Sequence, residues 1–156
     1  MPAIEDRQQL EHALELAYRY LNRRDRTVSE VRRHLEHRGI TAAALAQALE
    51  TLLEQGYLDD SRYARLFTAD KRELEQWGGG RIRRALLERG VERELVEGAL
   101  ASQQSELERA LALLRRRFPS PPVDRRERER ALGVLLRKGY ESELALDALS
   151  AYARGV

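Results

Sequence analysis

Three copies of one sequence pattern recur along the chain, and this repetition restricts the possible folds more than any other feature. Each copy centres on a glycine that follows a basic residue: Gly39 after Arg38, Gly90 after Arg89 and Gly139 after Lys138. Aligning the first two glycines also places Arg32-Arg33 on Arg83-Arg84 and Ala48-Leu49 on Ala99-Leu100. A period of about 50 residues is typical of tandem repeats, in which neighbouring units bury surface that one unit could not.

Helical periodicity accompanies each copy. Apolar residues follow the i, i+3, i+4, i+7 spacing of an amphipathic helix at Leu10, Ala13, Leu14, Ala17 and Leu21, and again from Leu107 to Phe118. No window shows the sustained alternation of a strand. We therefore predict an all-α fold of three tandem three-helix repeats, over residues 1–57, 58–103 and 104–156, in an elongated, curved molecule.

Capping chemistry marks several helix boundaries. Thr27-Val28-Ser29-Glu30 is a capping box, and Asp124 with Glu127 repeats its spacing. Asp59 and Asp60 precede a further helical stretch, where a carboxylate can accept hydrogen bonds from unpaired amides at the start of the helix. At the other end, a basic residue followed by glycine fits a helix that closes with a left-handed residue, so Gly39, Gly90 and Gly139 are assigned a structural role.

Composition excludes several classes of protein. The chain has 156 residues and no cysteine, which removes disulfide scaffolds, thiol nucleophiles and thiolate zinc sites. No stretch approaches the roughly 20 apolar residues that span a bilayer, and the first residues lack a secretory signal. We therefore expect a soluble cytoplasmic protein with no membrane association.

Arginine clusters are the main candidates for partner binding. The formal net charge is only +2, so an anionic partner would be attracted by local groups of positive charge and not by the chain as a whole. Interleaved acids make a solvated face the alternative for each cluster, and we prefer that alternative for residues 125–130. Arg81, Arg83 and Arg84 precede any acid on their helix and follow three glycines. The candidates that contact a protein partner or DNA phosphates are Arg24, Arg26, Arg32, Arg33, Arg81, Arg83, Arg84, Arg115, Arg116 and Arg117.

No group of residues suggests catalysis. Gly78-Gly79-Gly80 lacks the spacing and the Lys-Ser/Thr ending of a phosphate loop, and is interpreted as a hinge beside Trp77. The three histidines are too few and wrongly spaced for a metal site. Helix capping explains Asp59 and Asp60 better than a catalytic pair does. We expect no enzyme activity, no cofactor and no metal.

These blocks resemble the RecX family of regulatory proteins, which act on the recombinase RecA. The resemblance is densest in three segments: Leu58 to Ala64, with Asp59, Asp60, Tyr63 and Ala64; Gly80 to Gly90; and Leu21 to Gly39. It implies a protein that lies in the helical groove of the RecA filament on single-stranded DNA. It further implies inhibition of ATP hydrolysis, strand exchange and LexA cleavage, which would damp recombination and the SOS response.

One alternative function remains open. In each repeat, the two helices joined by the glycine turn also resemble a helix-turn-helix unit, so the chain could bind duplex DNA directly as a regulator. The basic excess is small for such a protein, and Ala44, Leu45, Ala48 and Leu49 make the last helix of the first repeat apolar. We expect a monomer whose own contact with DNA is weak and nonspecific.

Overall fold

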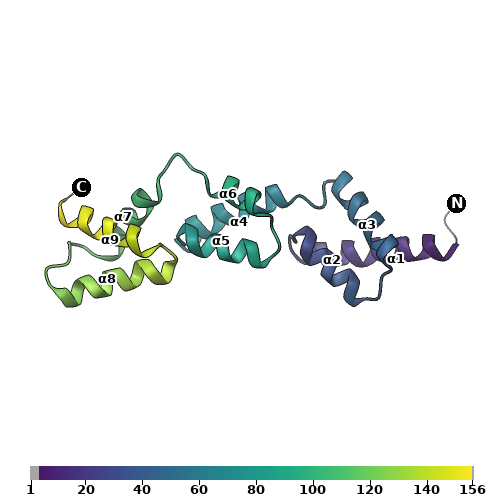
Figure 1. Ribbon diagram of the computed structural model, residues 1–156, viewed down its shortest axis with the longest axis horizontal. Coiled ribbons are helices and arrows are strands. Elements are labelled where there is room, and N and C mark those ends of the chain that lie inside the picture. The colour runs from purple at the N-terminus through teal and green to yellow at the C-terminus, as the bar shows by residue number, and fades with distance from the viewer. Residues whose placement is uncertain (1–3, 156) are drawn as a thin grey trace. The chain divides into compact units, whose positions relative to one another are not determined.

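The computed structural model describes residues 4–155, and these residues form nine α-helices and no strand (Figure 1). This confirms the predicted all-α class. The helices are α1 (Ile4–Arg23), α2 (Val28–His37), α3 (Ala42–Glu54), α4 (Asp60–Leu74), α5 (Gly79–Glu88), α6 (Arg93–Leu100), α7 (Glu106–Arg117), α8 (Arg125–Lys138) and α9 (Ser142–Ala153).

The chain divides into two compact units. Within the described residues, 4–64 and 86–96 form the first unit, and 65–85 together with 97–155 form the second. Helices α4, α5 and α6 therefore each contribute residues to both units. The two units are described separately below.

The core of the first unit lies among α1, α2 and α3, which pack against one another. The predicted apolar stripe of α1 is buried at Ala13 and Ala17, and α2 buries Val31 and Leu35. Most of the apolar face of α3 is also buried, including Ala44, Leu45, Ala48, Leu49 and Leu52. Since apolar burial stabilises by roughly 25 cal/mol per Å², this continuous face is the main source of stability here.

The core of the second unit lies among α7, α8 and α9, with α7 and α8 both packed on α9 (Figure 1). Leu114 and Leu135 are fully buried in it. The Tyr152 hydroxyl donates a 2.6 Å hydrogen bond to the carbonyl oxygen of Phe118, the C-cap residue of α7. This bond ties the start of the proline-containing segment to the last helix.

Side-chain caps begin the helices where the sequence predicted them. Thr27 and Glu30 form the complete capping box of α2, with both hydrogen bonds 3.1 Å long. Asp124 accepts from the Glu127 amide at the start of α8, and Asp59 accepts from the Arg62 amide in the first turn of α4. Such caps satisfy backbone amides that a helix cannot pair internally.

The three repeat glycines adopt the predicted left-handed conformation, with φ of 76° at Gly39, 85° at Gly90 and 99° at Gly139. This conformation costs any residue with a Cβ atom roughly 1–2 kcal/mol. Each glycine therefore lets its helix end abruptly and the chain turn into the next helix.

In the first unit, the glycine turn at Gly90 receives the start of α2. The Thr27 hydroxyl donates to the carbonyl oxygen of Arg89 at 2.7 Å, and the Ser29 hydroxyl donates to that of Gly90 at 3.3 Å. The Val28 amide donates to Asp60 of α4 at 2.9 Å. We call this set of contacts the first joint, because it connects the first repeat to the second.

In the second unit, the glycine turn at Gly139 receives the start of α5 in the same way. The Gly78 amide donates to the carbonyl oxygen of Lys138 at 2.6 Å, and the Gly80 amide donates to that of Gly139 at 3.1 Å. The Gly79 amide donates to Glu106 of α7 at 2.9 Å. This second joint uses the positions that align with Thr27, Val28 and Ser29 in the repeat.

The second joint corrects the interpretation of Gly78-Gly79-Gly80 as a hinge. Gly79 and Gly80 lie inside α5, and the backbone of this segment is held against the following repeat. A Cβ atom on Gly78 would lie 2.6 Å from the Tyr140 nitrogen, and one on Gly80 would lie 2.9 Å from the Gly139 oxygen. These glycines allow two backbones to meet where a side chain would separate them.

The joints predict different costs for the same substitution at equivalent glycines. Gly39→Ala should lower the free energy of unfolding by about 1–2 kcal/mol, because only the left-handed conformation is penalised and no atom lies within 4 Å of the new Cβ. Gly90→Ala should cost about 1–3 kcal/mol more, because its Cβ would overlap the side chain of Ser29. Urea denaturation measures both.

The double variant Gly90→Ala with Ser29→Gly provides the control. Removing the Ser29 side chain removes the overlap, so part of the lost stability should return despite the cost of about 0.5–1 kcal/mol for a glycine in a helix. Equal stability of the Gly39 and Gly90 variants would contradict the first joint.

Candidate functional site

Two exposed arginines occupy equivalent positions in the first two repeats. Arg33 lies on the exposed face of α2 and Arg84 on that of α5. Within residues 4–155, neither side chain takes part in an ion pair. Arg32 is likewise exposed and without an ion pair in this part of the chain. These guanidinium groups are available to an anionic partner.

Arg83 differs from its sequence equivalent, Arg32. It donates to Glu97 of α6 at 2.6 Å, and a second carboxylate, Glu141, lies 3.8 Å away. The hydrogen bond with Glu97 raises the pKa of Arg83 above its ordinary value. The sequence showed no acid near Arg83 on its own helix, but the fold brings two acids from elsewhere to it. Arg83 is therefore engaged within the second unit.

Arg81 belongs to the second joint. Its guanidinium lies 4.1 Å from the centre of the Trp77 ring and donates to the carbonyl oxygen of Arg137 at 3.1 Å. A Cβ atom added to Gly139 would overlap the Arg81 Cβ, so the two backbones meet closely there. Substituting Arg81 would disturb the joint as well as the surface charge.

Arg24 and Arg26 share one carboxylate but differ in burial. Both approach Glu30, at 3.9 Å and 3.8 Å. The Arg26 side chain is only 11% exposed, and its guanidinium covers the Tyr20 ring at 3.9 Å. His34 stacks on the same ring, and burial followed by the charges of Arg38, Arg26 and Arg23 lowers its pKa. Arg26 therefore supports the fold, and Arg24 remains accessible.

Arg115, Arg116 and Arg117 form the last turn of α7 and are exposed. Cations in this position interact favourably with the negative end of the helix dipole. That contribution explains the cluster without a binding partner, although the exposed Arg116 and Arg117 side chains could still contact one.

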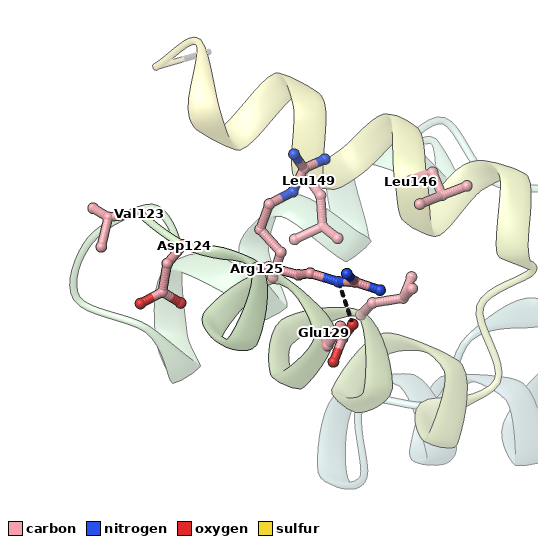
Figure 2. A pocket seen from close by; sticks show the side chains of 8 residues that line it. Val123, Asp124, Arg125, Glu129, Leu146 and Leu149 are labelled. Atoms are coloured by element: carbon pink, nitrogen blue, oxygen red, sulfur yellow. Dashed lines mark hydrogen bonds and ion pairs between the residues drawn. The ribbon is translucent and has the colours of Figure 1, made fainter.

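The arginine-rich segment 125–130 forms part of a solvated helix face, as the interleaved acids predict. The Arg125 guanidinium meets the Glu129 carboxylate at 3.1 Å, one helical turn along α8, as the dashed line in Figure 2 shows. Both residues border a cavity of about 410 Å³ that also touches Leu146 and Leu149 of α9.

The acidic block at the start of α4 serves the fold. Asp59 caps the helix, and Asp60 accepts from the Val28 amide in the first joint. Burial raises the pKa of Asp60, and the Val28 amide opposes that effect. Ala64 is fully buried, and partial burial raises the pKa of Tyr63.

The described part of the chain contains neither a metal site nor a membrane-spanning helix. No group of three or more histidine, aspartate or glutamate side chains is arranged to hold a metal ion there. No helix between residues 4 and 155 is both long and apolar enough to cross a membrane.

The third helix of each repeat offers little to a DNA phosphate. Neither α3 nor α9 contains an arginine or lysine, and α6 contains only Arg93 together with Glu94 and Glu97. Helices that enter a DNA groove usually carry basic side chains toward bases and phosphates.

Two residues of the joints are not predicted from the sequence as contacts between repeats. The spacing at Ser29 indicates only a capping box, and Glu106 belongs to no recognised motif. Glu106 lies in the first turn of α7, as Asp60 lies in the first turn of α4. An acid at the start of the helix that opens each following repeat was therefore a detectable signal.

The fold and its two equivalent joints define an all-α protein built from tandem three-helix repeats. Sequence models of the RecX domains match the chain in order: the first three-helix domain over residues 13–52, the second over 59–100 and the third over 104–149. The chain belongs to the RecX family of regulatory proteins.

Individual relatives support this membership. The chain is 38% identical over 134 residues to the regulatory protein RecX of Trichlorobacter lovleyi, covering 82% of this chain and 87% of the relative. It is 34% identical over 134 residues to the regulatory protein RecX of Leptothrix cholodnii, and the match covers 85% of this chain and 84% of the relative.

Solved structures show the same fold. The crystal structure of RecX from Lactobacillus salivarius matches with a TM-score of 0.80 at 19% identity, covering 96% of this chain and 99% of that one. A second crystal structure, of a regulatory protein RecX, matches with a TM-score of 0.71 at 24% identity, and the match covers 90% of this chain and 71% of that one. Three tandem three-helix repeats are thereby confirmed.

Burial predicts which arginines of the first repeat stabilise the fold. Arg26→Ala should lower the free energy of unfolding by about 1–2 kcal/mol, because it removes a desolvated cation from the Tyr20 ring. Arg33→Ala should change it by less than about 0.5 kcal/mol, as at other exposed positions. Chemical denaturation of the two variants compares them directly, and equal losses would show that the assignment of Arg26 to the fold is wrong.

Proposed function

We propose that the chain binds the RecA filament on single-stranded DNA and inhibits it. In this proposal it lowers ATP hydrolysis, strand exchange and LexA cleavage, and so damps recombination and the SOS response. Membership of a family of regulatory proteins is the observation that carries the proposal. The chain acts by occupying a partner surface, without a catalytic step of its own.

Exposed arginines at repeated positions supply a plausible contact. Arg33 on α2 and Arg84 on α5 present the same charge at equivalent places in two repeats. A filament also presents the same surface repeatedly. Contacts made by several repeats on neighbouring RecA protomers would combine through a high effective concentration, so the assembled filament would bind more tightly than free RecA.

Direct recognition of duplex DNA is less well supported. The third helices, which would enter a groove in a helix-turn-helix protein, carry one basic residue among them. Their apolar faces are used in packing, as for Ala48 and Leu49 of α3. A monomeric state, an elongated form, a cytoplasmic location and weak nonspecific DNA contact stay predictions, as do the repeat boundaries at residues 57 and 103.

Titration into RecA, single-stranded DNA and ATP tests the proposal. Hydrolysis should fall well before one chain is present per RecA protomer, because each bound chain affects several protomers. Unchanged turnover across a full titration would contradict inhibition. Tight duplex binding without RecA, with a steep salt dependence, would favour the DNA-binding alternative.

Charge reversal tests the contact surface. The double variant Arg33→Glu with Arg84→Glu should require on the order of ten-fold more protein for half inhibition, because losing charge pairs at a partner surface costs about 1–2 kcal/mol. The double variant Arg126→Glu with Arg128→Glu, at two exposed positions of α8, is the control of equal charge change and should inhibit as the wild type does. Circular dichroism checks that each variant keeps its helical content.

Wild-type inhibition by the double variant would place the contact elsewhere on the chain. Equal weakening by the control would indicate a general effect of charge. Either result would remove Arg33 and Arg84 from the proposed surface while leaving the inhibitory function itself open to the titration.

A further inference from the structure

A polar pocket in the second unit gathers positive charge that the proposed function does not use. It has a volume of about 240 Å³ and is bordered by the end of α4, by α7 and by Tyr140. Three arginines line it, Arg72, Arg109 and Arg116, together with the amide side chains of Gln76 and Gln104. This combination of groups consists largely of hydrogen-bond donors.

Two of the arginines are fixed in place by their terminal nitrogens. Arg72 donates to the carbonyl oxygen of Leu100 at 2.7 Å and approaches Glu106 at 3.5 Å. Arg109 donates to the Ser102 hydroxyl at 2.8 Å. In both side chains the Nε atom is buried and has no hydrogen-bond partner in the described part of the chain. A buried donor without an acceptor is costly, so neither guanidinium is fully satisfied by the protein groups around it.

The charges around the pocket do not balance. Glu106, outside the lining, is the acid next to Arg72, and the exposed Glu73 is the carboxylate that borders the pocket. Against these stand three guanidinium groups. Burial, and then the nearby positive charge of Arg109, lower the pKa of Arg72, while Glu106 opposes both effects. An added anion would therefore be stabilised by the arginines.

Backbone conformation singles out the same place. Gln76 has a φ of 59°, and among residues 4–155 it is the only residue other than glycine with a positive φ. Such a conformation is unfavourable for a residue with a Cβ atom and is often kept where it positions a functional group. Here it allows the chain to leave α4 so that Gln76 and Trp77 both border the pocket.

The remaining lining favours a compact anion over a nucleobase. The Trp77 ring is already contacted by Lys71 at 4.7 Å and Arg81 at 4.1 Å, so cations take the place that a stacked base would need. Tyr140 is buried, and burial raises its pKa to about 12. Its hydroxyl therefore stays protonated at neutral pH and can act as a donor.

We propose that this pocket is a binding site for the phosphate group of a small ligand, held by Arg72, Arg109 and Arg116. Planar guanidinium groups match the geometry of phosphate oxygens and form strong charge-assisted hydrogen bonds. The site needs no RecA, so it can be tested on the isolated chain and independently of the proposed function.

Trp77 provides the readout, because it is the single tryptophan of the chain and borders the pocket. Pyrophosphate, inorganic phosphate and ATP are titrated separately at constant ionic strength, and tryptophan fluorescence is recorded. We expect a saturable change with pyrophosphate. A comparable response to ATP would identify nucleotides as the source of the phosphate, and a response to free phosphates alone would identify those as the ligand.

Two variants and one control assign the site. Arg109→Gln and Arg116→Gln should each weaken pyrophosphate binding on the order of ten-fold, the loss expected for one hydrogen bond to a charged group. Arg116 is an exposed residue at the rim, so its variant should remain folded even if the Arg109 variant does not. Arg126→Gln, on α8 and outside the pocket lining, should bind as the wild type does.

Three results would overturn the proposal. The first is no saturable signal with any phosphate by fluorescence and by calorimetry. The second is an equal response to chloride at the same ionic strength. The third is binding by a short single-stranded oligonucleotide with none by pyrophosphate or ATP, which would make the pocket part of a nucleic-acid surface.

Discussion

The structure depends on unpaired carbonyl oxygens at the ends of two helices. At Gly90 and Gly139 the left-handed turn exposes the carbonyl oxygens of the glycine and of the basic residue before it. In each joint the first turn of a helix from the preceding repeat donates to these oxygens. Helix ends leave backbone groups unpaired, and the second joint pairs the amides of one helix start with the carbonyl oxygens of another helix end, whereas side-chain hydroxyls donate in the first. The connection between repeats is therefore made by directional hydrogen bonds.

The two joints use different donors for the same task. In the first joint, the hydroxyl groups of Thr27 and Ser29 donate to the carbonyl oxygens of the glycine turn at Gly90. In the second joint, the backbone amides of Gly78 and Gly80 donate to those of the turn at Gly139. In both cases the helix so anchored is the one that carries an exposed arginine, Arg33 on α2 or Arg84 on α5. Each joint thus holds one of these charges on an anchored helix, and the proposed function assigns both charges to the contact with the filament.

Local chemistry was predictable from the sequence, and contacts between distant residues were not. The capping box at Thr27 and the left-handed glycines depend on residues within a few positions, so their spacing predicted them. The triple glycine was interpreted wrongly, because its requirement comes from Gly139 and Tyr140 some 60 residues away. For the same reason Arg83 resembled a free cation until the fold brought Glu97 and Glu141 to it. Arg72 and Arg109 gave no signal, because neither belongs to an arginine cluster in the sequence.

Amide hydrogen exchange tests the joints most directly. Amides in the first turn of a helix usually exchange fast because they lack a partner within the helix. The amides of Val28, Gly78 and Gly80 should instead exchange slowly, since Asp60, Lys138 and Gly139 accept from them. Ala42 and Ala43, at the start of α3, provide the internal comparison and should exchange fast. Exchange of the joint amides at the rate of Ala42 and Ala43 would contradict the account.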